Sequence, residues 1–148
     1  MVCRLLRQPK RKGTVRRLSL SFGSRVSRLR ELGIYSDFYY RKEIKPLAQM
    51  LGEYERLNCL LTGVHEGNRK MVAVTDRRII VLFTALGGGD VKIIRRESVK
   101  AYRFEKKFLF SSLVIETNGG AVFTFTNTQG KLKDLFDWAM SQPLPSAE

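Results

Sequence analysis

Few side chains in this sequence could carry out chemistry, and the densest group is Asp76-Arg77-Arg78, set between aliphatic runs in VAVTDRRIIVLF. Two adjacent arginines beside an acid could clamp an anion. The same residues could form a polar bend between two strands. Thr75 or Asp76 would then accept backbone hydrogen bonds, while the arginines face solvent or a neighbouring acid. We interpret the segment as a structural turn, with the anion clamp as the alternative.

Two further types of side chain could act in catalysis, but neither has the partners that it needs. His65 lies beside Glu66 in VHEGN, and no nucleophile is recognisable around this pair, so we interpret His65 as a solvated loop histidine. Cys59 lies in an apolar run and is interpreted as an inert core thiol. Cys3 could be lipidated or oxidised. The sequence therefore predicts no catalytic residues and no enzyme.

A phosphate loop and a metal centre are not supported either. The segment LGGGD, residues 86–90, lacks the Lys-Ser/Thr pair of a phosphate loop and precedes a predicted strand, where that motif requires a helix. We interpret it as a flexible hairpin loop. The acidic residues lack calcium-loop spacing, and two cysteines with one histidine do not supply a zinc ligand set. We expect no metal, no cofactor and no small-molecule substrate.

Positive charge is concentrated at the beginning of the chain. The net charge is +13, and the first 30 residues contain ten basic residues and no acidic one. The rest of the chain holds the other 17 of the 27 basic residues and all 14 acidic ones, so it is nearly neutral. This asymmetry predicts a cationic arm that binds a polyanion. Its basic residues are Arg4, Arg7, Lys10, Arg11, Lys12, Arg16, Arg17, Arg25, Arg28 and Arg30.

The composition of the arm leaves three roles open. Near an anionic membrane, each Lys or Arg adds about 1 kcal/mol of attraction. On a nucleic acid the same side chains would release counterions, and the eight arginines among the ten suit bidentate phosphate contacts. Phe22 is the only aromatic residue in the arm and offers little base stacking. The third role is a solvated tail that promotes solubility.

The length and composition predict one folded domain with a tail. The chain has 148 residues, of which 43% are hydrophobic, enough for a packed core. Its apolar runs are too short to span a bilayer, and no secretory signal follows the basic start. We expect a cytoplasmic protein that could attach peripherally to the inner membrane surface.

Hydrophobic periodicity predicts the elements that must position these residues. Before residue 56 the pattern favours short helices. One would be capped by Ser24 and stopped by Gly33, and a second segment at 36–52 would be interrupted near Pro46. A period of two then predicts seven strands, with Asn118-Gly119-Gly120 as a tight hairpin turn. The predicted strands are 57–62, 69–75, 79–84, 91–95, 99–104, 110–117 and 121–127.

The period changes back to that of a helix after the last strand. Apolar residues from Leu132 to Met140 fall on one stripe and predict a helix at 129–141, with Thr128 as a cap and Pro143 beyond its end. Seven short antiparallel strands followed by an amphipathic helix predict a mainly β fold with helices. The expected architecture is a small barrel or sandwich plugged by the last helix.

This order resembles that of the small bacterial and phage pleckstrin-homology-like (PH-like) proteins. The resemblance covers residues 36–141 and rests on DFYYRKEIKPLAQMLGEYE, TDRRIIVL, ESVKAYRFEKKFLFSSLVIET and KLKDLFDWA. It implies a seven-stranded antiparallel barrel or sandwich closed by a C-terminal helix. The predicted organisation is a basic arm at 1–35 and a PH-like domain at 36–148.

The resemblance also implies a class of function. PH-like barrels bind phosphoinositides, peptides or other subunits, so we expect a non-enzymatic binding or scaffold module. It would engage a protein partner or its own copies through exposed strand edges. The alternative is an RNA- or ribosome-associated protein whose arm binds phosphates. In KKFLF, Phe108 and Phe110 could be exposed or could cap the core, and we favour the core. Candidate contacts on the barrel are Arg69, Lys70, Arg77, Arg78, Lys106, Lys107 and Phe108.

Overall fold

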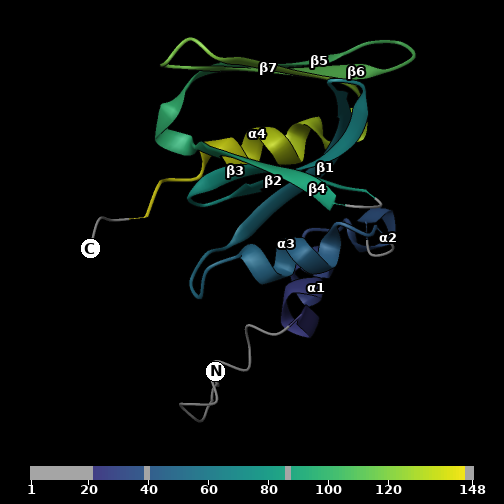
Figure 1. Cartoon of the computed structure of the whole chain (residues 1–148), viewed down its shortest axis with the longest axis vertical. Coiled ribbons are helices and arrows are strands. Elements are labelled where there is room, and N and C mark those ends of the chain that lie inside the picture. Colours follow the sequence, from purple (N-terminus) through teal and green to yellow (C-terminus); the bar gives the residue numbers. More distant parts are fainter. Residues whose placement is uncertain (1–21, 39–40, 86–87, 146–148) are drawn as a thin grey trace. The chain divides into compact units, whose positions relative to one another are not determined.

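The computed structural model describes residues 22–38, 41–85 and 88–145, with the side chains of 22–26 excepted. The chain divides between Tyr54 and Glu55 into two compact units. The first contains three short helices, and the second contains the sheet and the closing helix (Figure 1). None of the described helices is long and apolar enough to cross a membrane. The domain boundary at 35/36 stays a prediction.

The first helix of the helical unit has one of its two predicted end signals. Helix α1 spans Phe22–Glu31 and is followed by Gly33, which has φ +77°. The Gly33 N–H donates to the Arg30 carbonyl and the Ile34 N–H to the Leu29 carbonyl, so the expected glycine stop is confirmed. The expected Ser24 cap is wrong, because the helix already begins at Phe22.

The next two helices are the short pieces that the sequence predicted. Helix α2 spans Tyr35–Phe38 and helix α3 spans Ile44–Met50. The break lies between them and not at Pro46, which sits in the first turn of α3. Helix N–H groups have no intrahelical partner there, so proline costs no hydrogen bond.

The second unit forms one antiparallel sheet of seven strands, as predicted. The strand order is β4-β3-β2-β1-β7-β6-β5. The strands are β1 Leu57–His65, β2 Asn68–Thr75, β3 Arg78–Ala85, β4 Gly88–Arg95, β5 Val99–Lys106, β6 Ser111–Thr117 and β7 Val122–Thr128.

The sheet bends so that β1 to β4 form one layer and β5 to β7 form another, with the closing helix between them (Figure 1). This arrangement confirms the expected mainly β fold with a closing helix. The sheet is open, with β4 and β5 as its two ends. The 3₁₀ turn Arg96–Ser98 joins them, and the helix fills the space between the layers, so the two strands do not pair.

Two strand details differ from the sequence prediction. The expected loop ALGGGD is shorter, because β4 already begins at Gly88. Gly89 pairs with Thr84, and a Cβ on Gly89 would collide with the Phe83 carbonyl, so this glycine lets the strands approach. Strand β1 is buried on both faces from Leu57 to Gly63, whereas alternating residues suggested one inward face.

The closing helix is split into two parts. Gly130–Leu132 forms a 3₁₀ turn, and α4 spans Lys133–Ser141. The expected cap at Thr128 is wrong, because Thr128 is the last residue of β7 and its hydroxyl has no hydrogen-bond partner within the described residues. Phe136 and Ala139 are fully buried, which confirms the core-facing stripe.

Asp137 joins the closing helix to β5 and also accepts a hydrogen bond within the helix. The Tyr102 hydroxyl donates to an Asp137 carboxylate oxygen at 2.9 Å, and the Lys133 ammonium donates to the other oxygen at 2.7 Å. Burial of the phenol, with the Asp137 contact as a second cause, raises the pKa of Tyr102 to about 12. Tyr102 therefore stays a hydrogen-bond donor at neutral pH.

We expect Gly63→Ala to lower the free energy of unfolding by about 1–3 kcal/mol, because the added methyl overpacks the crossing of β1 and β7. A Cβ on Gly63 would lie 2.8 Å from both Phe125 Cβ and Thr128 Cγ2. Urea unfolding of the full chain measures the loss. Gly119→Ala is the control, because Gly119 has no heavy atom within 4 Å of its Cβ position. Equal losses in the two variants would contradict the prediction.

Candidate functional site

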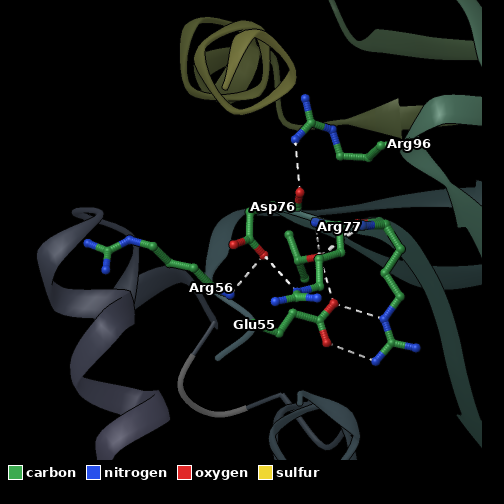
Figure 2. Close-up of polar contacts among 7 residues, drawn as sticks. Glu55, Arg56, Asp76, Arg77 and Arg96 are labelled. Carbon is green, nitrogen blue, oxygen red and sulfur yellow. Dashed lines mark hydrogen bonds and ion pairs between the residues drawn. The ribbon is translucent and has the colours of Figure 1, made fainter. Parts of the chain in front are cut away.

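The Thr75-Asp76-Arg77-Arg78 segment is a turn built around a buried ion pair. Glu55, just before β1, is buried, and its carboxylate accepts two hydrogen bonds from the Arg78 guanidinium, at 2.8 and 3.0 Å (Figure 2). The Thr75 hydroxyl donates to Glu55 at 2.7 Å and accepts the backbone N–H groups of Arg77 and Arg78, each at 3.0 Å. The hydrogen bonds and charge of Glu55 raise the pKa of Arg78. Arg78 is therefore occupied within the fold.

Asp76 completes the turn. One carboxylate oxygen accepts the Arg56 backbone N–H at 3.1 Å, and the Asp76 N–H donates to the Arg56 carbonyl at 3.0 Å (Figure 2). Arg77 is half-exposed and lies 3.9 Å from the Asp76 carboxylate. This geometry favours the structural turn over the anion clamp, because Arg78 is held by Glu55 and Arg77 lies beside Asp76.

Arg96 links this turn to the end of the closing helix. One of its guanidinium nitrogens donates to the carbonyls of Met140 at 2.9 Å and Gln142 at 2.6 Å. The other terminal nitrogen lies 3.4 Å from the Asp76 carbonyl (Figure 2). A cation at a helix C-terminus complements the helix dipole and satisfies carbonyls that lack helical partners. Sequence reasoning missed this role, because no local pattern marks a contact 46 positions away.

The first hairpin turns within VHEGN, between two of the predicted strands, and does not present a basic cluster. Glu66 and Gly67 both have positive φ, as a tight two-residue turn requires. Arg69 donates to the Thr62 hydroxyl at 2.8 Å and to the Asn127 carbonyl at 3.2 Å, so it bridges β2 to β7. Lys70 is buried, 3.4 Å from Glu66 and 3.8 Å from the Asp90 carboxylate. Both cations have partners inside the sheet unit.

The loop between β5 and β6 is different, because its apolar side chains face solvent. Phe108 is 99% exposed, Leu109 is 82% exposed and Phe110 is 49% exposed. The Lys107 N–H donates to the Phe110 carbonyl at 3.1 Å, which places Phe108 and Leu109 at the tip of a reverse turn. The favoured interpretation, in which Phe108 and Phe110 cap the core, is therefore wrong, and the exposed alternative holds.

The candidate barrel contacts fall into separate groups. Arg69-Lys70 lie near the start of β2, and Arg77-Arg78 follow its end. Residues 106–108 lie in the other layer, where β5 ends and the β5–β6 loop begins. They do not form one basic cluster. Only the last group combines exposed apolar and cationic side chains, so it is the strongest contact candidate.

The arm is described only in part. Arg4 to Arg17 lie outside the described residues. Arg28 and Arg30 lie on α1, where Arg28 donates to Glu31 at 2.8 Å and Arg30 stacks over the Tyr35 ring at 4.0 Å. Arg25 also belongs to α1, whose residues 22–26 have no described side chains.

No family model matches this chain, and no curated protein matches it. Among solved structures, it is similar to the crystal structure of a pleckstrin homology domain from Shewanella amazonensis SB2B. The sequence identity is 17% and the TM-score is 0.46, and the alignment covers 66% of this chain and 86% of that one. The seven strands and closing helix described above are observed in the chain itself.

The candidate catalytic side chains are held in structural positions. His65 is not the expected solvated histidine: its side chain is only 16% exposed, because it packs on Phe123 and Phe125. Its Nδ1 lies 2.9 Å from the Thr124 carbonyl, which can only accept, so Nδ1 carries the proton. Cys59 is fully buried, and burial raises the pKa of its thiol, in agreement with an inert core cysteine. The described part of the chain holds no group of three metal-ligating side chains.

Proposed function

We propose that this chain is a non-enzymatic binding module that a cationic arm tethers to an anionic membrane surface. The observation that carries this proposal is the division of charge. Ten basic residues and no acid occupy residues 1–30, and the remainder is nearly neutral. Such an arm attracts an anionic surface at long range, and the attraction weakens as salt rises.

The charges of the sheet unit support the same division. Many of its cations are engaged with neighbouring acids. Lys70 contacts Glu66, and Arg103 contacts Glu105 and Glu116, each acid at 3.5 Å from the arginine. Cations that are already compensated add little attraction for a distant polyanion. The arm therefore makes the main contribution to the long-range attraction between the chain and an anionic surface.

The open sheet supports a protein-binding role for the second unit. Strands β4 and β5 each pair with one neighbour only, so each has one backbone edge without a strand partner in the sheet. An extended segment of a partner, or a second copy of the chain, could add a strand there. The module would then hold this partner beside the membrane.

The test of the tether compares the full chain with two charge-matched variants. The arm variant replaces Arg4, Arg7 and Arg11 with glutamine, and the control replaces Arg77, Arg95 and Lys100. Sedimentation with vesicles rich in phosphatidylserine measures partitioning over a salt series. We expect the arm variant to bind about tenfold more weakly or worse at low salt, and the control to change by about threefold or less.

Three results would count against the tether. Equal losses in the two variants would show that net charge alone matters. Retention of the full chain on single-stranded RNA but not on vesicles would support the nucleic-acid alternative. If neither polyanion is bound at physiological salt, the arm serves solubility.

A further inference from the structure

The β5–β6 loop, residues 107–110, presents an apolar tip that the fold does not require. Reverse turns usually carry glycine, asparagine or aspartate, whose conformations and polar side chains suit the position. Here the two central residues are Phe108 and Leu109, and both are almost fully exposed. Apolar side chains in water carry an unfavourable hydration free energy that burial would remove. The loop therefore has the properties of a binding surface whose apolar side chains are buried by a partner outside this chain.

Cationic side chains lie at the base of this tip. Lys106 and Lys107 precede it, and Lys107 is 56% exposed and lies 3.5 Å from the Glu105 carboxylate. A Cβ on Gly130 would lie 3.6 Å from Lys106 Cγ, so the start of the closing 3₁₀ turn lies beside the loop. The next residue there, Lys131, is exposed. The loop thus combines a narrow apolar point with lysines at its base.

This combination matches a lipid bilayer better than a protein surface. A stable protein interface usually needs a broad buried patch of about 800 Å² per partner with an apolar centre. The apolar part here is a short protruding tip, and the residues that precede it, Glu105 to Lys107, are charged and exposed. In an anionic bilayer, the tip can enter the acyl region while the lysines stay among the phosphates.

We infer that Phe108 and Leu109 insert into an anionic lipid bilayer while Lys106 and Lys107 contact its headgroups. The inference deepens the proposed function, because it adds a short-range anchor to the long-range tether and assigns the surface to lipid. The arm would bring the chain to the membrane, and the loop would fix how the sheet unit meets it.

The first test measures partitioning of full-length variants onto phosphatidylcholine vesicles that contain about a third phosphatidylserine. Phe108→Ser/Leu109→Ser should weaken partitioning by about tenfold or more, and the loss should persist at high salt, because it is hydrophobic. The control is Tyr54→Ser/Leu144→Ser, which removes two other exposed apolar side chains, 79% and 44% exposed. Equal losses in the two double variants would overturn the inference.

The second test detects insertion directly and separates it from the tether. Phe108→Trp is combined with Trp138→Phe, so that the only tryptophan is at the tip. Quenching by lipids with brominated acyl chains is then measured with the natural arm and with the neutralised arm at high lipid concentration. Quenching in both chains supports insertion. Arm-dependent binding without quenching overturns the insertion alone. The measurement is repeated at low lipid concentration, where binding should depend on the arm. Equal quenching in the two chains there overturns the tether alone.

Discussion

Arg78→Met is expected to lower the free energy of unfolding by about 3 kcal/mol, because it leaves the Glu55 carboxylate buried without its cation. The Glu55 side chain is 3% exposed, and Arg78 supplies two of its hydrogen bonds. The Thr75 hydroxyl would remain as a neutral donor and cannot replace the charge. Chemical denaturation of the full chain measures the change.

Arg77→Met is the matched control. Arg77 is adjacent, its side chain is 50% exposed, and its contact with Asp76 is 3.9 Å long. Exposed ion pairs contribute about 0–1 kcal/mol, so this variant should lose little stability. A further variant, Glu55→Leu with Arg78→Met, should recover part of the loss, because it removes the buried carboxylate that has lost its Arg78 contact. If Arg77→Met costs as much as Arg78→Met, the buried pair does not hold the turn.

Phe136→Ala is expected to cost about 3–5 kcal/mol, because it opens a cavity between the two layers of the sheet. Phe136 is fully buried, and its ring lies 5.1 Å from the Tyr102 ring and 5.7 Å from the Phe104 ring. The loss should appear as a lower denaturation midpoint in urea.

Trp138→Ala on the same helix is the comparison. Trp138 is 42% exposed, so its truncation removes less buried surface and should cost clearly less. Similar losses for the two aromatic residues would mean that α4 does not fill the space between the layers.

The strands could be predicted because local patterns determine them. Apolar alternation located every strand to within a few residues, and Gly119-Gly120 and Glu66-Gly67 marked two of the tight turns. The exception was Gly88 to Asp90, where glycines suggested a loop. There the absence of a side chain allows a close strand pairing, and sequence gives no sign of which use a glycine has.

The contacts of the candidate site depend on residues far apart in sequence, and these could not be predicted. Nothing local to Glu55 shows that it meets Arg78 across 23 positions. The exposure of Phe108 could not be predicted for a different reason. The sequence indicates the position of the loop, but the aromatic residue type by itself favours a buried ring. Whether β5 and β6 bury its ring depends on the direction of the turn, which only the structure gives.

The junction of β1 and β7 has a consequence for folding order. Each hairpin joins strands that are close in sequence, whereas the two layers meet through contacts such as Gln129 with Thr62, 67 positions apart, and His65 with Thr124, 59 apart. Loop-closure entropy opposes such distant contacts, so we expect the hairpins to form first and the layers to join last. The same junction would be the first to separate under native conditions, without loss of either layer. Amide hydrogens at this boundary should therefore exchange sooner than those inside β2 and β3.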